Sequence, residues 1–497
     1  MSHKHDYRQI FKATSLFGGV QGFNILIGFA RNKVVTVLLG PEGFGIVNLF
    51  NSTISVITSY TSLGLSFSAL RNISQANETG DEESFARTII TFRRWMWFSG
   101  LLGTVITLLL SPLLSQWTFG SGEYTVSFIW IAFSFLLASQ TNARNTMLQG
   151  MRKLKLLARS NVAGSVLGLL ISLPLYYFLG VRGIVPALLA SAVAGFILAW
   201  YLTRSIAVAP VSLSLRESVF QGMDMVRLGI LTTLSASAWY SVNLFVNAYV
   251  TRTGGLGELG LYQAGHSLTN QSVNLVFTAM IVDFFPRLAG IQGNVLKERQ
   301  TVNQQVEVAA LLIAPLTLAF VSFLPIAVHI MYTPSFMRIT EYVQWYFLGI
   351  LFKATYWSMG YLIMARGDTR TYIFLELSSC LLFAALATAG YRFFGLQGLG
   401  ASYLVSHLLF CILYYVIVSR KYQFAFSLTL GVVLLVQTLL SVLLFLCIRW
   451  FGYPVATYAG IFICALSGGF SLWQINKRLD LKDLISSRFG KNRERHE

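Results

Sequence analysis

The sequence contains few charged residues and few cysteines. Only 11% of its 497 residues are Asp, Glu, Lys or Arg, whereas a soluble globular protein carries about 25%. This scarcity excludes an ordinary soluble domain. The four cysteines lie in apolar segments without the paired spacing of a metal site or a disulfide framework, at Cys380, Cys411, Cys447 and Cys464, so we interpret them as small packing residues.

The motifs of common enzymes are also missing. We find no P-loop, no HExxH helix, no nucleophile elbow and no cluster of Cys and His ligands. We therefore expect a protein that is not an enzyme and needs no cofactor. Without an ATP site, the energy for any transport must come from an ion gradient, the membrane potential or the substrate gradient.

What the sequence has in abundance is long apolar runs. Hydrophobic residues make up 55% of the chain, and uncharged runs such as 95–114 favour membrane-spanning helices over the alternation of a β-barrel. We predict an all-α polytopic membrane protein of about fourteen transmembrane helices, at residues 14–39, 45–70, 91–114, 125–149, 158–179, 182–203, 228–251, 257–286, 305–331, 341–365, 371–391, 396–418, 425–449 and 453–474.

The basic residues are distributed unevenly between the two sides of these helices. With the N-terminus inside, 28 of the 37 Lys and Arg residues fall in inside segments, five in outside loops and four within helices. The positive-inside rule therefore predicts that both termini are cytoplasmic. The net charge of +17 sits in loops and at the C-terminus rather than on a basic stripe, so we expect no nucleic-acid partner.

The two halves of the sequence match each other at an offset of 215 residues. Residues 176–198 match 391–413 at eight positions, and Gly40 and Gly45 match Gly255 and Gly260. An offset that spans six helices predicts two parallel six-helix lobes with a central cavity between them, as in transporters that alternate between two open sides. The predicted domains are 1–216 and 217–421, followed by two additional helices (422–474) and a basic cytoplasmic tail (475–497).

Polar residues are concentrated in a few of the predicted helices, chiefly those at 45–70, 228–251 and 257–286. This clustering favours a hydrated cavity, with Ser, Thr and Asn that join packed helices as the alternative. The candidate substrate-binding amides are Asn32, Asn51, Asn243, Asn247 and Asn270.

Four cations lie within the predicted helices. Arg31 is nine residues from Gly40, or about 13 Å along a helix, which is too deep for easy contact with water. Lys353 lies mid-helix and is the best partner for Arg31, while Arg144 lies nearer an inner end, where snorkelling is an alternative. Lys33 lies two residues beyond Arg31, on another face of the helix.

Few acids lie at comparable depth. Asp283 and Glu376 lie toward the inner ends of their helices, and His266 is a third titratable candidate. These three are candidate coupling residues, with structural roles as the alternative. The excess of embedded cations predicts an anionic substrate, and a phosphate or diphosphate suits an arginine that binds two oxygens at once.

One stretch resembles a known family. Gly28-Phe-Ala-Arg31, followed by an apolar segment and Gly40-Pro-Glu-Gly43-Phe-Gly45, resembles the first-helix motif of bacterial flippases in the MOP exporter superfamily. The resemblance is closest to the polysaccharide transport branch, the Wzx-type O-antigen flippases. It implies that the chain moves undecaprenyl-diphosphate-linked oligosaccharides across the bacterial inner membrane by alternating access, with Arg31 at the diphosphate and the last two helices along the lipid tail.

Other functions stay open. A lipid II flippase would differ only in its glycan, and a MATE-like cation-coupled drug exporter should show embedded acids that face a cationic drug. A scaffold protein without transport is disfavoured by the polar interior. The expected partners are the lipid-linked glycan, membrane lipids and the polysaccharide polymerase machinery.

Overall fold

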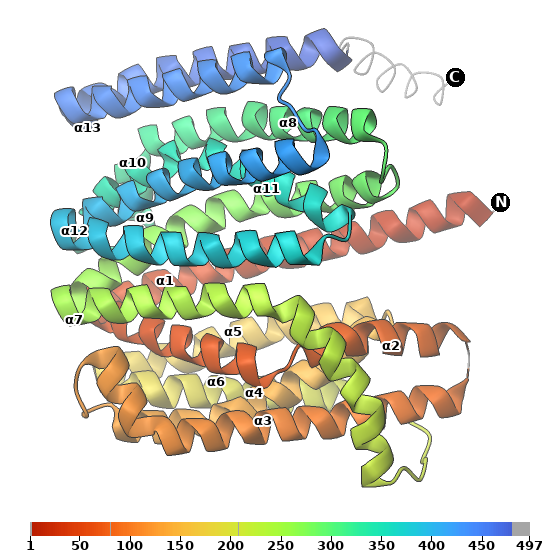
Figure 1. Ribbon diagram of the computed structural model, residues 1–497. Helices are drawn as coiled ribbons and strands as arrows, with labels where there is room; N and C mark the ends of the chain where they lie inside the picture. The colour runs from red at the N-terminus through yellow and green to blue at the C-terminus, as the bar shows by residue number, and fades with distance from the viewer. Residues whose placement is uncertain (1, 80, 207, 480–497) are drawn as a thin grey trace, which may run out of the picture. The chain divides into compact units, whose positions relative to one another are not determined.

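The computed structural model describes residues 2–79, 81–206 and 208–479; within these ranges, the side chains of residues 2–18 and of several residues between 228 and 283 are not described. The regular structure in these ranges is helical throughout (Figure 1). The helices are α1 Ser2–Thr61, α2 Leu65–Thr79, α3 Glu82–Phe119, α4 Thr125–Gly150, α5 Leu154–Leu179, η1 Gly180–Gly183, α6 Ile184–Thr203, α7 Leu215–Ala289, α8 Val295–Ser322, α9 Leu324–Met331, η2 Pro334–Phe336, α10 Ile339–Leu348, α11 Ile350–Ala365, α12 Thr369–Tyr422 and α13 Leu428–Leu479. The predicted tail beyond Leu479 lies outside the described residues.

The helices are long and apolar enough to make this a multi-pass membrane protein. Seven of the described helices meet that requirement, or eight when the bent pair α10 and α11 is one span. Three of them, α1, α12 and α13, hold two spans each, because each contains an internal glycine with non-helical backbone angles. Residues 154–203 count as one stretch but divide into α5 and α6 at η1, and α7, which lies outside that count, divides into two arms at Gly255. Together these arms bring the total to 14 helices, which confirms the predicted fold class.

The glycines that divide these helices take left-handed φ values at positions 215 residues apart. Gly40 and Gly255 have φ of 66° and 86°, and Gly180 and Gly395 have φ of 57° and 59°. A side chain would be strained at such angles, so glycine is required where the chain reverses. In the same register, α4 ends at Gly150 and α11 at Ala365. The backbone thus repeats at the predicted offset.

Three predicted spans are interrupted in the structure. The run 45–70 breaks after Thr61 because Leu63 and Gly64 both have positive φ, and α2 begins at Leu65. The run 305–331 breaks between α8 and α9, and the run 341–365 bends by 48° between α10 and α11. Hydropathy detects none of these breaks, because the residues on both sides belong to one predicted apolar run.

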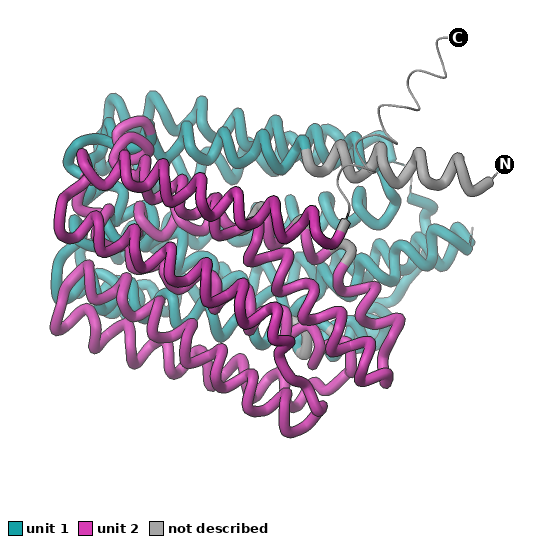
Figure 2. Tube along the Cα trace, turned by 90° about the horizontal axis from the view of Figure 1, so that it is seen from above, with its two compact units in different colours: residues 1–263, 331–335 teal, residues 264–330, 336–497 magenta. Residues whose placement is uncertain are grey.

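The chain divides into two compact units (Figure 2). Unit 1 comprises residues 1–263 and 331–335, and unit 2 comprises residues 264–330 and 336–497. This grouping follows spatial proximity and places the first arm of α7 with unit 1. The predicted lobes 1–216 and 217–421 stay a prediction.

Close backbone contact joins α1 and α7 within unit 1. A Cβ atom on Gly45 would lie 2.2 Å from the Leu256 carbonyl oxygen, and one on Gly260 would lie 1.9 Å from the Pro41 carbonyl oxygen. Only glycine permits helices to cross at this separation. The paired glycines of the sequence repeat therefore do two jobs, reversing the chain and letting the following arms pack together.

Candidate functional site

Arg31 is half-buried in the first arm of α1. Its guanidinium interacts electrostatically with the hydroxyl of Tyr176, which lies on α5 in the same unit and is only 1% exposed. Among the described side chains, no carboxylate forms an ion pair with Arg31. The cation predicted from the sequence is thus embedded and has a phenol, not an acid, beside it.

Lys33 is held in a different way. Its ammonium group donates a 2.5 Å hydrogen bond to the Tyr332 carbonyl oxygen, which belongs to unit 1. This contact agrees with the prediction that Lys33 and Arg31 occupy different faces of the helix.

The candidate amides of unit 1 differ in how fully they are engaged. Asn247 is 1% exposed, donates to Ser52 Oγ at 2.8 Å and accepts from Gln263 Nε2 at 2.6 Å. Its hydrogen-bonding capacity is therefore largely used to join α1 to α7, which is a packing role. Asn243 donates to the Trp239 carbonyl oxygen on its own helix at 2.9 Å.

Asn32 and Asn51 are both partly exposed, on the two arms of α1. Asn32 has an interaction partner within the fold. Asn51 precedes Ser52, which contacts Asn247 where α1 meets α7. Of the predicted amides in unit 1, Asn32, Asn51 and Asn243 retain exposed surface, and Asn247 is buried.

Arg144 is directed toward α6 of its own unit. Its Nη1 atom lies 3.3 Å from Thr203 Oγ1, and its guanidinium stands 5.5 Å from the centre of the Phe196 ring. Its Nε atom is buried without a hydrogen-bond partner, as is Gln140 Nε2 nearby, and both residues line a cavity of about 40 Å³. These contacts lie between α4 and α6 and give no direct support to the prediction that Arg144 binds substrate.

Lys353 lies on α11 in unit 2. Its ammonium group stands 5.7 Å from the centre of the Phe277 ring, and its charge acts on His266 and His407. No described carboxylate pairs with it. Because Arg31 belongs to unit 1 and Lys353 to unit 2, their joint action on one ligand stays a prediction.

His266 and Asn270 form the centre of a polar network among aromatic rings in unit 2. Asn270 Nδ2 lies 2.6 Å from His266 Nε2, and Tyr403 Oη lies 2.9 Å from His266 Nδ1. Tyr346 donates to Asn270 Oδ1 at 3.2 Å. Both ring nitrogens of His266 thus have partners, and the sequence had shown only that His266 and Asn270 lie one helical turn apart.

Glu376 is half-buried on α12 and accepts a 3.0 Å hydrogen bond from the Tyr414 hydroxyl. Tyr414 also packs against Tyr356, whose hydroxyl lies 3.5 Å from His407 Nδ1. A titratable carboxyl and two histidines therefore lie in one aromatic region of unit 2. The side chain of Asp283, the third candidate coupling residue, lies outside the described residues.

Other buried acids have their own cations. Glu298 is 2% exposed and pairs with Arg366, and Glu307 is 5% exposed and pairs with Arg478. The sequence prediction missed Glu307 as an embedded acid, because it begins an apolar run and its partner lies 171 residues away. It also missed Tyr176, since nothing in a sequence distinguishes a tyrosine that faces an arginine from one that packs in a core.

The long, paired apolar helices can be compared with those of solved membrane proteins. The chain has the fold of the MOP superfamily: it is similar to a multidrug resistance MATE family transporter of that superfamily in an inward-facing conformation, with a TM-score of 0.69, 17% identity and coverage of 80% of this chain and 94% of that one. It is also similar to the lipid II flippase MurJ in an inward closed conformation, with a TM-score of 0.67, 12% identity and coverage of 93% and 99%.

The family follows from the sequence match. Residues 34–341 match the family model described as "Polysaccharide biosynthesis protein", which is more than half of the chain, and the chain belongs to this family. It is also 22% identical over 393 residues to proteins named lipid III flippase from Escherichia coli (strain K12) and Shigella flexneri, covering 77% of this chain and 91% of each relative. The resemblance found in the Arg31 and Gly40 motifs is therefore confirmed in the polysaccharide family and in the fold of the MOP superfamily.

Proposed function

We propose that the protein is a flippase for lipid-linked oligosaccharide. In this proposal it moves an undecaprenyl-diphosphate-linked repeat unit, such as that of O-antigen, from the cytoplasmic to the periplasmic leaflet by alternating access. It acts in the bacterial inner membrane with both termini cytoplasmic, carries out no chemical reaction, and passes its product to the polysaccharide polymerase machinery.

The proposal rests on two embedded cations that form no ion pair with a described acid. Arg31 and Lys353 form no ion pair among the described residues, while the buried Glu298 and Glu307 each have a cation. A charge at membrane depth is costly unless an opposite charge meets it. A diphosphate headgroup supplies that charge, and the relatives named lipid III flippase support a lipid-linked glycan.

Substitution of Arg31 by an uncharged residue tests this proposal. Arg31→Ala should lower the surface polysaccharide made by complemented cells by more than about tenfold, since a charge-assisted hydrogen bond to phosphate contributes about 1.5–3 kcal/mol. Membrane insertion and thermal stability should stay unchanged. Arg71→Ala, which removes an exposed arginine on α2, is the control and should have no effect. Normal export by the Arg31→Ala variant would refute the proposal.

A second variant tests how the anion is bound. Arg31→Lys keeps the charge but loses the planar fork that binds two oxygens. If bidentate binding matters, export by this variant should fall almost as far as for Arg31→Ala. Recovery of most of the export would show that charge alone suffices.

A lipid II flippase is the second candidate, supported by the structural likeness to MurJ. The two candidates differ in the glycan, so mass spectrometry of the lipid that accumulates on depletion of the protein distinguishes them. We expect a polysaccharide repeat unit on the undecaprenyl carrier. Accumulated lipid II would favour the second candidate, and no accumulation would favour the drug exporter.

We also propose that transport is coupled through titratable groups of unit 2. Glu376, held by the Tyr414 hydroxyl, and His266, held by Asn270 and Tyr403, are the described candidates. Glu376→Gln should abolish the response of transport to an imposed pH gradient in vesicles while substrate binding persists. Unchanged coupling in both Glu376→Gln and His266→Gln would remove these residues from the proposal and leave Asp283.

A further inference from the structure

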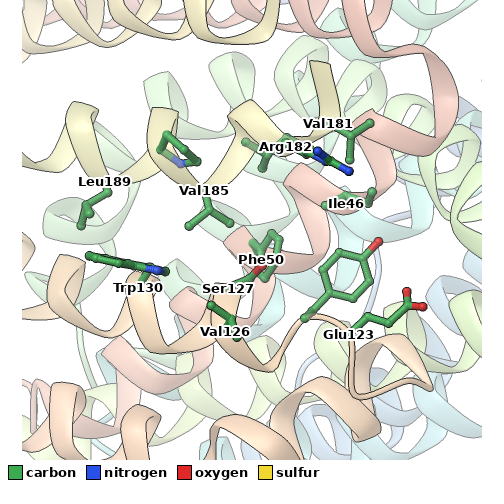
Figure 3. Close-up of a pocket in the computed structure, with 13 residues that line it drawn as sticks. Ile46, Phe50, Glu123, Val126, Ser127, Trp130, Val181, Arg182, Val185 and Leu189 are labelled. Carbon is green, nitrogen blue, oxygen red and sulfur yellow. The ribbon is translucent and has the colours of Figure 1, made fainter. Parts of the chain in front are cut away.

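A large open cavity lies at one end of unit 1, separate from Arg31. Its volume is about 860 Å³, within the ~300–1,000 Å³ of typical ligand sites. It lies where the turn between α5 and α6 meets the start of α4 and the second arm of α1 (Figure 3). Nothing in the proposed transport function accounts for it.

The cavity is polar at one end and apolar at the other. Figure 3 shows Arg182 and Glu123 at one end, and Trp130 and Leu189 at the opposite end. Trp130, on α4, follows Glu123 by seven residues, and Leu189, on α6, follows Arg182 by seven residues. Both walls therefore change from charged to apolar over the same number of residues. This gradient is typical of a lipid site with its headgroup at the mouth.

The two charges at the mouth differ in sign. Arg182 and Glu123 are both exposed, and they form no ion pair with each other or with another described residue. A purely anionic headgroup would be repelled by Glu123, and a purely cationic ligand by Arg182. A headgroup that carries both a phosphate and an amine complements both.

The repeat allows this cavity to be compared with the equivalent place in unit 2. At the 215-residue offset, Val185 corresponds to Gly400 and Trp130 to Trp345. In unit 2 a Cβ atom on Gly400 would lie 2.5 Å from the Tyr342 carbonyl oxygen and 2.9 Å from Trp345 Cβ, so α12 packs directly on α10. In unit 1, Val185 lines the cavity at the position that this glycine holds in the close contact of unit 2.

In unit 2, α13 covers the surface that corresponds to this cavity. Trp345 packs on Phe445 of α13 with their ring centres 4.5 Å apart, and Gln397 donates to Glu341 Oε2 at 3.0 Å. Trp130 has no such cover and is 55% exposed. An exposed tryptophan over an apolar cavity needs an apolar neighbour in the membrane, and unit 1 has no additional helix pair of its own to supply one.

We propose that this cavity binds a phospholipid with an amine headgroup, of the phosphatidylethanolamine class. The phosphate lies against Arg182, the ammonium against Glu123, and one acyl chain along Trp130 and Leu189. The bound lipid thereby covers Trp130 of unit 1, as α13 covers the corresponding Trp345 of unit 2. This site does not depend on the proposed flippase activity.

Native mass spectrometry of the full chain tests the proposal. The protein is equilibrated with equal amounts of phosphatidylethanolamine, phosphatidylglycerol and phosphatidylcholine that carry identical chains. We expect one retained lipid, predominantly phosphatidylethanolamine, because phosphatidylglycerol lacks the amine and the quaternary amine of phosphatidylcholine cannot donate a hydrogen bond. Equal retention of the three lipids by the unmodified protein would overturn the proposal, whatever the variants do.

Variants then assign the contacts. Arg182→Gln should lower total retained lipid at least about tenfold, the scale of one charge-assisted hydrogen bond. Glu123→Gln should remove the preference for the amine lipid while leaving total binding largely intact. Trp130→Ala should also lower total retained lipid, because it removes apolar surface along the proposed acyl chain. The control for Arg182→Gln is Arg392→Gln, an exposed arginine beside a turn of unit 2, and the control for Trp130→Ala is Trp97→Ala, at a tryptophan of similar exposure.

The remaining outcomes contradict the proposal. Loss of lipid from the Arg392→Gln control to the same extent as from Arg182→Gln would show nonspecific binding. Displacement of phosphatidylethanolamine by equimolar polyprenyl phosphate would assign the cavity to the tail of a transported lipid instead. Neither result bears on the export assay with Arg31→Ala, so failure of this proposal and failure of the proposed function are distinguishable.

Discussion

Arg31 and Tyr176 show how one embedded residue is accommodated. The cation is half-buried, and the phenol beside it is 1% exposed with a hydroxyl that forms no hydrogen bond of ordinary geometry. A hydroxyl dipole partly compensates a charge without neutralising it, so Arg31 keeps its capacity to bind an anion. This arrangement is what a site for a transient anionic ligand requires.

Tyr176→Phe tests that arrangement. The hydroxyl contributes no hydrogen bond of ordinary geometry to the fold, so the melting temperature should stay within experimental error. Without the orienting dipole, the concentration of lipid-linked substrate for half-maximal transport in proteoliposomes should rise about three- to tenfold, the scale of one modest polar interaction. A large loss of stability with unchanged transport would assign Tyr176 to packing alone.

Asp368 shows the effect of charge at the end of a helix. It caps α12 by accepting from the Thr371 backbone N–H at 3.2 Å, and it also pairs with Lys421 and accepts from Tyr422. The Lys421 and Tyr422 contacts hold the pKa of this carboxyl well below its usual range. A carboxyl with a lowered folded-state pKa contributes stability above its unfolded pKa of about 3.9 and loses it as the pH falls.

The ion pair of Asp368 should make the stability of the detergent-solubilised protein depend on pH in the acid range. The unfolding free energy should decrease by about 1 kcal/mol as the pH falls below ~4. Asp368→Asn keeps an N-cap acceptor but should remove this part of the pH dependence. Asp368→Ala should lose both the cap and the charge and be less stable than Asp368→Asn at neutral pH. Identical acid unfolding curves for the wild type and Asp368→Asn would contradict this account.

At the scale of helices, the glycines of α1 and α7 determine how closely the two arms pack. Gly260→Ala would place a Cβ 1.9 Å from the Pro41 carbonyl oxygen, so the arms must separate, and the contacts that join them, such as Ser52 with Asn247, must loosen. We expect a decrease of several degrees in melting temperature. Gly469→Ala on α13, where nothing lies within 4 Å, is the control and should be neutral or slightly stabilising. Equal melting temperatures for both variants would refute the close packing.

At the scale of the whole molecule, the distribution of cations predicts the orientation in the membrane. Single cysteines placed at Gly122 and at Asn77, in a background without the four natural cysteines, should react differently with a membrane-impermeant maleimide added to intact cells. Gly122→Cys should be labelled, and Asn77→Cys only after lysis. The reverse pattern would invert the proposed topology and the direction of transport with it.

The sequence alone predicted much of the architecture. Long apolar runs, glycine turns and the 215-residue repeat anticipated the helical fold, and the backbone angles of Gly180 and Gly395 repeat as that offset requires. The sequence also identified Arg31 as embedded. It failed at breaks inside apolar runs, as after Thr61, where a local change of backbone conformation leaves hydropathy unchanged.

The sequence by itself determined which segments enter the membrane and where the chain reverses, because both depend on local composition. The excess of positive charge among the embedded residues stays a prediction. Only the tertiary structure decided which polar groups meet. It paired Asn247 with Ser52, Glu307 with Arg478 and Arg31 with Tyr176, and it left Trp130 uncovered where Trp345 packs on α13. Such contacts join residues far apart in the chain, and their formation depends on how each helix is rotated about its axis, which helical periodicity alone does not specify.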